Sequence, residues 1–149
     1  MAGSETIDRC REIGRRYVDF INAAELDPSY FEAETFVYNN PQGEQTDFAG
    51  AAGTLKYFES AFPDHHTTTY DEIVTEDRAV YRWITRGTHQ GEMLGLPPTG
   101  KSMELRGMTI LRIEDGKIHE VWENIDLLGL MQQLGAIPSP DQAPAGDPA

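Results

Sequence analysis

The residue best suited to acid/base chemistry in this sequence is Asp126. It stands between a β-rich stretch, Lys117 to about Asn124, and an apolar run that begins at Leu127. A carboxylate set among apolar side chains is desolvated, which disfavours its charged form and makes it a better general base. Asp126 is therefore a candidate for the base of a proton-transfer reaction.

The dipeptide Asp115-Gly116 determines which side chains accompany Asp126. Asp-Gly is the strongest short signal for a type I′ hairpin turn, because that turn needs two positive φ angles. Since side chains alternate along a strand, a two-residue turn predicts one face with the following pairs: Ile113 with Ile118, Leu111 with Glu120, Thr109 with Trp122, Gly107 with Asn124, and Leu105 with Asp126. The opposite face would pair Arg112 with His119, Ile110 with Val121, Met108 with Glu123, and Arg106 with Ile125. The first face is an apolar wall with a few polar groups, which is typical of a small-molecule pocket.

Asp126 has a second interpretation that the spacing leaves open. A residue at the junction of a strand and a helix can be the N-cap of that helix, with its carboxylate accepting a hydrogen bond from the first turn. The other reactive side chains offer less. Cys10 has no base near it in the sequence, and His65, His66, His89 and His119 lack the spacing of zinc ligands.

The hydrophobic pattern predicts the elements that must position these residues. Amphipathic spacing indicates a helix from Thr6 to about Ala23, and capping signals indicate further helices at about 28–32, 48–62 and 127–135. A short strand at 36–38 and four longer strands, at 67–74, 79–89, 102–113 and 117–124, carry β-branched and aromatic residues. Helices followed by antiparallel strands predict an α+β domain over residues 1–137, with a disordered Pro/Ala-rich tail over 138–149.

Composition and charge exclude several classes of function. With 25 acidic and 12 basic residues the formal net charge is −13, which opposes binding to nucleic acid or to an anionic membrane. The only cysteine is Cys10, so no intramolecular disulfide can form, and this usage suits a reducing cytoplasm. The first 25 residues are charged throughout and lack the apolar core of a signal peptide. We expect a cytoplasmic protein with a small hydrophobic molecule as its partner.

Several sequence blocks, taken together and in order, resemble the SnoaL-like polyketide cyclase (ester cyclase) family. The blocks are Phe62-Pro63-Asp64, Arg82-Trp83, Arg86 to Glu92, Gly95 to Lys101, Arg112 to Ile118, and Trp122 through Asp126 to Gly135. The resemblance implies a fold like nuclear transport factor two: a cone-shaped, curved antiparallel sheet with three N-terminal helices packed on it. It also implies a homodimer formed through the outer face of the sheet, and no metal or organic cofactor.

The resemblance further implies an activity and its residues. Characterised members close a ring of an aromatic polyketide by intramolecular aldol condensation, and their catalytic aspartate corresponds by resemblance to Asp126. Asn39 and Asn40 lie where members of the family often carry a polar pocket residue, and either is a candidate oxyanion donor; a role as turn asparagines is equally open. Tyr17 and Trp83 are candidates for the pocket wall, with packing in the core as the alternative.

One departure from the family pattern keeps other functions open. Some members carry a histidine on the strand before the hairpin, where this sequence offers Leu105, Gly107, Thr109 and Leu111, and only Thr109 is polar. Thr109, Leu111, Trp122 and Asn124 are therefore expected to line the pocket without a histidine. The alternatives are a non-catalytic protein that binds a small molecule and a related epoxide hydrolase or isomerase of the same fold.

Overall fold

The computed structural model describes residues 2–140, and the prediction of a disordered tail therefore falls largely, at 141–149, outside the described residues. The elements in chain order are α1 (Ala2–Ala23), the 3-10 helix η1 (Pro28–Tyr30), β1 (Val37–Asn39), β2 (Gln45–Thr46), α2 (Phe48–Ala61), β3 (His66–Val74), β4 (Arg78–Thr88), β5 (Ser102–Glu114), β6 (Lys117–Ile125) and α3 (Leu127–Gln133). The predicted α+β class is confirmed, and β2 is the one strand that the hydrophobic pattern missed.

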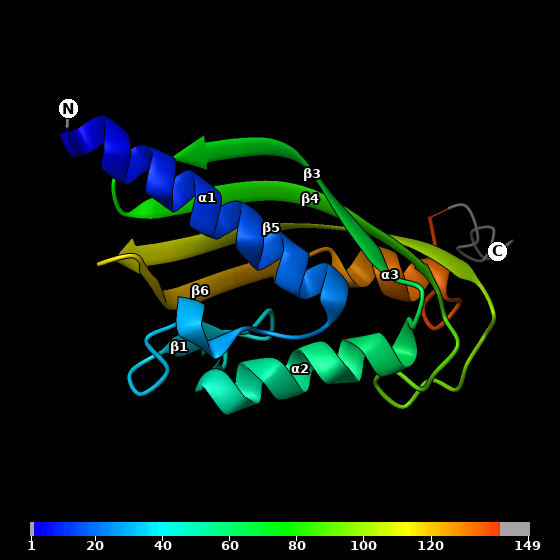
Figure 1. The fold of residues 1–149 in the computed structure, drawn as a ribbon. Coiled ribbons are helices and arrows are strands. Elements are labelled where there is room, and N and C mark those ends of the chain that lie inside the picture. Colours follow the sequence, from blue (N-terminus) through cyan, green and yellow to red (C-terminus); the bar gives the residue numbers. More distant parts are fainter. Residues whose placement is uncertain (1, 141–149) are drawn as a thin grey trace, which may run out of the picture.

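The strands form a single curved sheet in the order β2-β1-β6-β5-β4-β3 (Figure 1). Neighbouring strands are antiparallel except β1 and β6, which run parallel, so the expectation of a wholly antiparallel sheet is wrong at this pair. The long stretch of chain between β1 and β6 allows the parallel pairing, because parallel neighbours need a long crossover connection. Helix α2 and the four strands β2, β3, β4 and β5 lie between them in the sequence.

Helices α1 and α2 lie over one face of the sheet, and α3 packs against β5 (Figure 1). The buried face of α1 carries Cys10, Ile13, Tyr17 and Phe20, at the three- and four-residue spacing that brings side chains to one side of a helix. Gly14, on the same helix, allows close approach to the sheet, because an added Cβ there would overlap the Tyr81 hydroxyl. The space enclosed between these helices and the sheet contains the pocket described below.

The hairpin of β5 and β6 begins as the sequence predicts. Asp115 and Gly116 have φ angles of 51° and 73°, the two positive values of a type I′ turn, and Ile113 pairs with Ile118. The register then shifts at a β-bulge, so that Arg112 pairs with Glu120 and His119 has no partner on β5.

This bulge makes the predicted register wrong from His119 onward. One extra residue in a strand moves every later side chain to the other face. The observed pairs are Leu111 with Val121, Ile110 with Trp122, Thr109 with Glu123, Met108 with Asn124, and Gly107 with Ile125. The inner face of β6 therefore carries Val121, Glu123 and Ile125, and the outer face carries Trp122 and Asn124.

Candidate functional site

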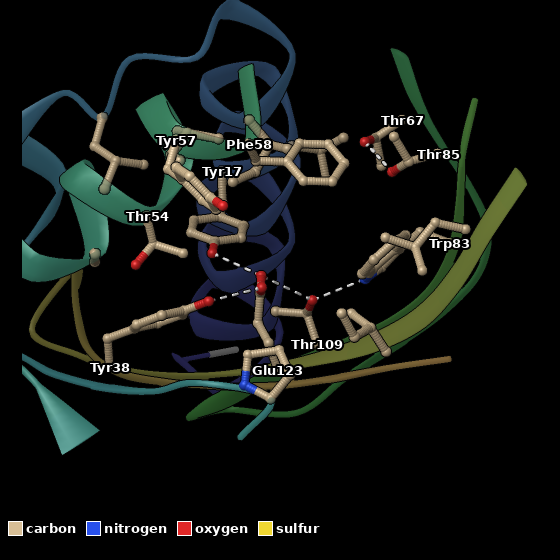
Figure 2. Close-up of a pocket in the computed structure, with 18 of the residues that line it drawn as sticks. Tyr17, Tyr38, Thr54, Tyr57, Phe58, Thr67, Trp83, Thr85, Thr109 and Glu123 are labelled. Carbon is tan, nitrogen blue, oxygen red and sulfur yellow. Dashed lines mark hydrogen bonds between the residues drawn. The ribbon is translucent and has the colours of Figure 1, made fainter. Parts of the chain in front are cut away.

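A pocket of about 180 Å³ lies between the sheet and the two long helices (Figure 2). Its wall is mainly aromatic and aliphatic, with side chains from α1, β1, α2, β3, β4, β5 and β6 and from the loop that follows β4. Among the described lining residues Glu123 is the one charged side chain. An apolar pocket with few, convergent polar groups is the usual form of a small-molecule site.

Glu123 is held by three hydroxyl groups, which come from three different elements. The Tyr17 hydroxyl of α1 and the Thr109 hydroxyl of β5 donate to Oε1, at 3.1 and 3.4 Å, and the Tyr38 hydroxyl of β1 donates to Oε2 at 3.1 Å (Figure 2). Tyr17, Tyr38 and Thr109 are themselves buried. The carboxylate is therefore fixed in position by groups that are fixed in turn.

The hydrogen bonds leave one oxygen of Glu123 open. An ionised carboxylate oxygen accepts about two hydrogen bonds. Oε1 already accepts from Tyr17 and Thr109, whereas Oε2 accepts from Tyr38 alone among the described residues. Oε2 is therefore the atom with a free lone pair, which can take a proton from a molecule in the pocket.

The surroundings of Glu123 change its acidity in a useful direction. Removal from water raises the pKa of the Glu123 carboxyl, and the hydrogen bonds from Tyr38, Tyr17 and Thr109 oppose that rise without cancelling it. Burial, followed by the nearby charge of Glu123, raises the pKa of both phenols, so Tyr17 and Tyr38 stay protonated as donors. A carboxylate with a raised pKa is a stronger base towards a carbon acid.

Trp83 extends this hydrogen-bonded group across the sheet. Its indole Nε1 donates to the Thr109 hydroxyl at 2.9 Å, so the same hydroxyl can donate its own hydrogen to Glu123 (Figure 2). Trp83 therefore fixes the direction in which the Thr109 hydrogen points. Thr109 lies on the pocket face, as the sequence predicts, but its partner across the hairpin is Glu123 and not Trp122.

The structure distributes the predicted pocket residues between two faces. Tyr17, Trp83 and Thr109 line the pocket. The bulge places Trp122 on the outer face, where the Arg78 guanidinium lies 6.0 Å from its ring, and leaves Asn124 exposed, so their predicted place in the wall is wrong. Leu111 faces inward but is fully buried in the core and does not reach the cavity.

Asp126 is also displaced from the wall by the bulge. It is exposed, its Oδ1 accepts from the Gly129 amide at 2.8 Å, and it is the N-cap of α3. The capping interpretation therefore describes its structure, and the pairing with Leu105 across the hairpin is wrong. A catalytic role for Asp126 stays a prediction, which a substitution described in the Discussion tests.

Asn39 and Asn40 lie outside the described pocket wall. Asn39 donates to Glu120 at 2.9 Å and to the Val121 carbonyl at 3.1 Å. The Asn40 side-chain oxygen accepts from the amides of the turn that joins β1 to β2. These contacts are those of turn and strand-edge residues, and the oxyanion role predicted for either stays a prediction.

Glu123 is the functional candidate that the hairpin argument placed on the wrong face. One signal in the sequence could have identified it: Ile118 and Val121 are both strongly apolar but three residues apart, so strict alternation cannot bury both. A bulge between them buries both and leaves Val121, Glu123 and Ile125 alternating on the inner face. A carboxylate between two inward apolar residues is the pattern of a polar group in a pocket wall.

The mouth of the pocket lies where lining residues are exposed, at Gln42, Thr54, Tyr57 and Leu94. The Leu94 amide donates to the Tyr57 hydroxyl at 2.8 Å, which ties the loop after β4 to α2. The volume of the cavity is below the roughly 300 Å³ of typical small-molecule sites. A molecule of several rings therefore has to displace side chains at the mouth.

The family model for SnoaL-like polyketide cyclases matches residues 11–134, which include every described residue that lines the pocket. The chain belongs to the SnoaL-like polyketide cyclase family. The fold expected for this family is confirmed, because the described elements are helices packed on one curved sheet. No group of three or more residues able to hold a metal ion occurs within the described part of the chain, and none of its described helices has the length and hydropathy of a membrane span.

Curated relatives within the SnoaL-like family are ester cyclases. The aklanonic acid methyl ester cyclase AcmA of Streptomyces galilaeus is 28% identical over 131 residues, which cover 81% of this chain and 87% of the relative. The aklanonic acid methyl ester cyclase DnrD of Streptomyces peucetius is 31% identical over 118 residues, covering 78% and 76%. These relatives and the family model support a cyclase, and neither favours the binding protein or the epoxide hydrolase.

Solved structures show the same architecture. AclR of Streptomyces galilaeus, described as a candidate hydroxylase, superposes with a TM-score of 0.80 at 25% identity, over 89% of this chain and 85% of its own. IdmH of Streptomyces antibioticus, described as a candidate polyketide cyclase, has a TM-score of 0.75 at 27% identity, over 84% and 97%. The fold is therefore shared by proteins with different described activities, so the function has to be argued from the pocket.

Proposed function

We propose that this protein is a cyclase that closes a ring by acid/base chemistry, with Glu123 as its base. The observation that carries the proposal is the setting of the Glu123 carboxylate in an apolar pocket, held at Oε1 by two donors and open at Oε2. This geometry supplies a desolvated base that points at a bound molecule. It needs only a substrate in which the C–H bond to be deprotonated is already made acidic by adjoining carbonyl groups.

The proposed reaction is an intramolecular aldol addition. Oε2 of Glu123 takes a proton from a carbon that adjoins carbonyl groups, and the C–H electron pair becomes a delocalised enolate. The enolate carbon then attacks a second carbonyl of the same molecule, which forms a C–C bond and turns that carbonyl into an alkoxide. The alkoxide takes the proton back from Glu123, so the product is an isomer of the substrate and the carboxylate is restored.

The phenols of Tyr17 and Tyr38 support both states of Glu123. They stabilise the carboxylate before proton transfer, and their raised pKa values keep their hydrogens available throughout the cycle. When Glu123 carries the abstracted proton, these phenols can turn their hydrogens towards a developing negative oxygen on the substrate, which such preorganised donors stabilise in a dry site. The chain thus supplies base and donors from its own side chains.

We propose an aromatic polyketide methyl ester as the substrate class. The support is the naming of the curated relatives for methyl esters of aklanonic acid and nogalonic acid, together with a pocket wall that is largely apolar and aromatic. An epoxide hydrolase of the Asp-Arg-Asp type has no counterpart here, because no arginine or aspartate occurs among the described lining residues.

Incubation of the purified protein with aklanonic acid methyl ester tests the proposal. We expect conversion to a product of unchanged mass, with the same rate after dialysis against a chelator, because the steps use no metal. A product that has gained an oxygen atom would instead support the hydroxylase activity described for AclR. Binding without any conversion would support the non-catalytic alternative and overturn the proposal.

We also propose that two copies associate through the outer face of the sheet, in the cytoplasm. The outer face carries the exposed side chains of Met108 and Ile110 beside several arginines, and large apolar side chains in a polar surround favour association. The single cysteine suits a reducing compartment. Sedimentation at tens of micromolar protein should show a dimer, and a dissociated species in the Met108→Asp variant; a wild-type monomer at these concentrations would contradict the proposal.

A further inference from the structure

A second polar group lines the pocket away from Glu123. The Thr67 hydroxyl of β3 and the Thr85 hydroxyl of β4 lie 2.6 Å apart, and both residues are buried and line the cavity. In Figure 2 the pair is at the upper right, above Trp83, whereas Tyr38 is at the lower left and the Glu123 carboxylate is near the centre. The pocket therefore has polar groups at two separated places with apolar wall between them.

One hydroxyl hydrogen of the Thr67–Thr85 pair is not used in the hydrogen bond between the two residues. Two hydroxyl groups carry two hydrogens, and one of them forms the bond between Thr67 and Thr85. The remaining hydroxyl hydrogen has no acceptor among the described residues. A buried donor without an acceptor is unfavourable, so an acceptor oxygen brought into the pocket at this point would gain a hydrogen bond at little cost.

The position of the pair is held from outside the pocket. Thr67 is on the edge strand β3, where its backbone would otherwise lack partners on one side. The Asn22 side chain at the end of α1 accepts from the Thr67 amide at 2.7 Å and donates to the Thr67 carbonyl at 3.0 Å. This two-point contact fixes the residue that carries one of the hydroxyls, as a binding group requires.

The strand register gives the distance between the two polar places. Glu123 pairs with Thr109, which pairs with Tyr81, and Thr85 lies four residues further along β4. At about 3.3 Å per residue and 4.8 Å per strand, the backbone positions of Glu123 and Thr85 are about 16 Å apart. Both side chains project from the same inner face of the sheet, so the two polar groups are separated by about this distance. A flat system of about three fused aromatic rings, with a hydrogen bond at each end, fits such a gap.

We propose that the Thr67–Thr85 pair is a second binding subsite, which donates a hydrogen bond to a carbonyl or phenolic oxygen at the end of the substrate remote from Glu123. The inference rests on the proposed function for the identity of the reacting end. It adds a requirement on the substrate: a flat system of about three rings with an acceptor oxygen at its far edge. Thr67 and Thr85 then determine which substrates bind and how a substrate is positioned along the pocket, and they take no part in the proton transfer.

Equilibrium binding of two probes of the same outline tests the subsite without any turnover. The first probe is 1,4-anthraquinone, whose carbonyl acceptors lie on a terminal ring, and the second is anthracene, which has no acceptor. Binding is followed by quenching of Trp83 fluorescence in a Trp122→Phe background, because Trp83 lines the pocket and Trp122 lies on the outer face. In the Thr67→Val/Thr85→Val variant, the Kd for anthraquinone should rise roughly 3- to 10-fold, the usual effect of one buried neutral hydrogen bond, while the Kd for anthracene stays unchanged.

Three controls keep the result specific. Thr68→Val changes the same residue type on the same strand but on the exposed, opposite face, so both Kd values should stay unchanged. The Thr67→Ser/Thr85→Ser variant keeps both hydroxyls and should keep the affinity for anthraquinone. The valine variant should melt at the wild-type temperature or above it, because replacing both partners of a buried pair with groups of the same shape is nearly neutral.

An unchanged Kd for anthraquinone in the valine variant, or an equal loss for both probes, would overturn the subsite. These outcomes are distinguishable from failure of the proposed function. Loss of the Glu123 mechanism would appear as turnover that survives Glu123→Gln, whereas the probe measurements involve no chemistry.

Discussion

Replacement of Glu123 by Gln is the decisive perturbation of the proposed mechanism. The amide keeps the size of the side chain and its capacity to accept from the hydroxyls of Tyr17 and Tyr38, which can also rotate to accept from it. It removes the negative charge and the basic lone pair on Oε2. A positioned general base contributes about 10²- to 10⁴-fold to a rate, so kcat/KM should fall by that factor, or about 3 to 5 kcal/mol in the barrier.

Asp126→Asn is the matched control, because it makes the same chemical change three residues along the chain. Asn is as good an N-cap as Asp, so helix α3 should be retained. The exposed position of Asp126 outside the pocket wall predicts a kcat/KM within about twofold of wild type, well under 1 kcal/mol in the barrier. The assay is initial rate against substrate concentration, with the product followed by chromatography and mass spectrometry.

Thermal melting of Glu123→Gln separates lost chemistry from lost folding. The folded pKa of Glu123 is raised above its unfolded value, so ionisation opposes folding. This penalty is absent below the unfolded pKa and is complete above the folded one. The melting temperature of the variant relative to wild type should therefore rise as pH increases through that window. Turnover above a tenth of wild type in Glu123→Gln, or an equal loss in Asp126→Asn, would refute the assignment of the base.

Three further predictions follow from the same contacts. Tyr38→Phe removes a donor that lowers the pKa of Glu123, so the acid limb of the pH profile of kcat should move to higher pH; a limb at the wild-type position would contradict the bond to Oε2. Asp126→Ala should lower the free energy of unfolding by about 1 kcal/mol through loss of the α3 cap, as measured by urea denaturation, whereas an unchanged midpoint would argue against that cap. Gly14→Ala should lower the free energy of unfolding by about 1–3 kcal/mol, because the added Cβ overlaps the Tyr81 hydroxyl. Adding Tyr81→Phe to this variant should restore part of that loss. Equal stability of Gly14→Ala and Gly14→Ala/Tyr81→Phe would show that the hydroxyl is not the obstacle.

Much of the architecture could be predicted because it depends on local signals. The spacing of Cys10, Ile13, Tyr17 and Phe20 predicts the buried face of α1, and Asp115-Gly116 predicts the hairpin turn, which has the expected φ angles. These features are properties of neighbouring residues. They can be read from the sequence because they do not depend on residues that are distant along the chain.

The strand β2 and the parallel pairing of β1 with β6 depend instead on distant partners. Gln45 and Thr46 have no apolar alternation of their own, and they become a strand only because β1 presents free backbone groups beside them. Nothing within residues 37–39 indicates that β1 joins a strand about 80 residues further along the chain. Pairings of this kind are selected by the packing of the whole sheet.

The candidate site also depends partly on local signals and partly on distant partners. The sequence by itself determined the family, the α+β class, the pocket-facing side of Thr109 and the presence of a carboxylate near the end of the hairpin. The tertiary structure decided which carboxylate enters the pocket, because burial of both Ile118 and Val121 forces a bulge at His119 and turns Glu123 inward. It also brought Tyr17 and Tyr38 to that carboxylate from elements more than 80 residues away, and Asp126, freed from the wall by the same bulge, became the cap of α3.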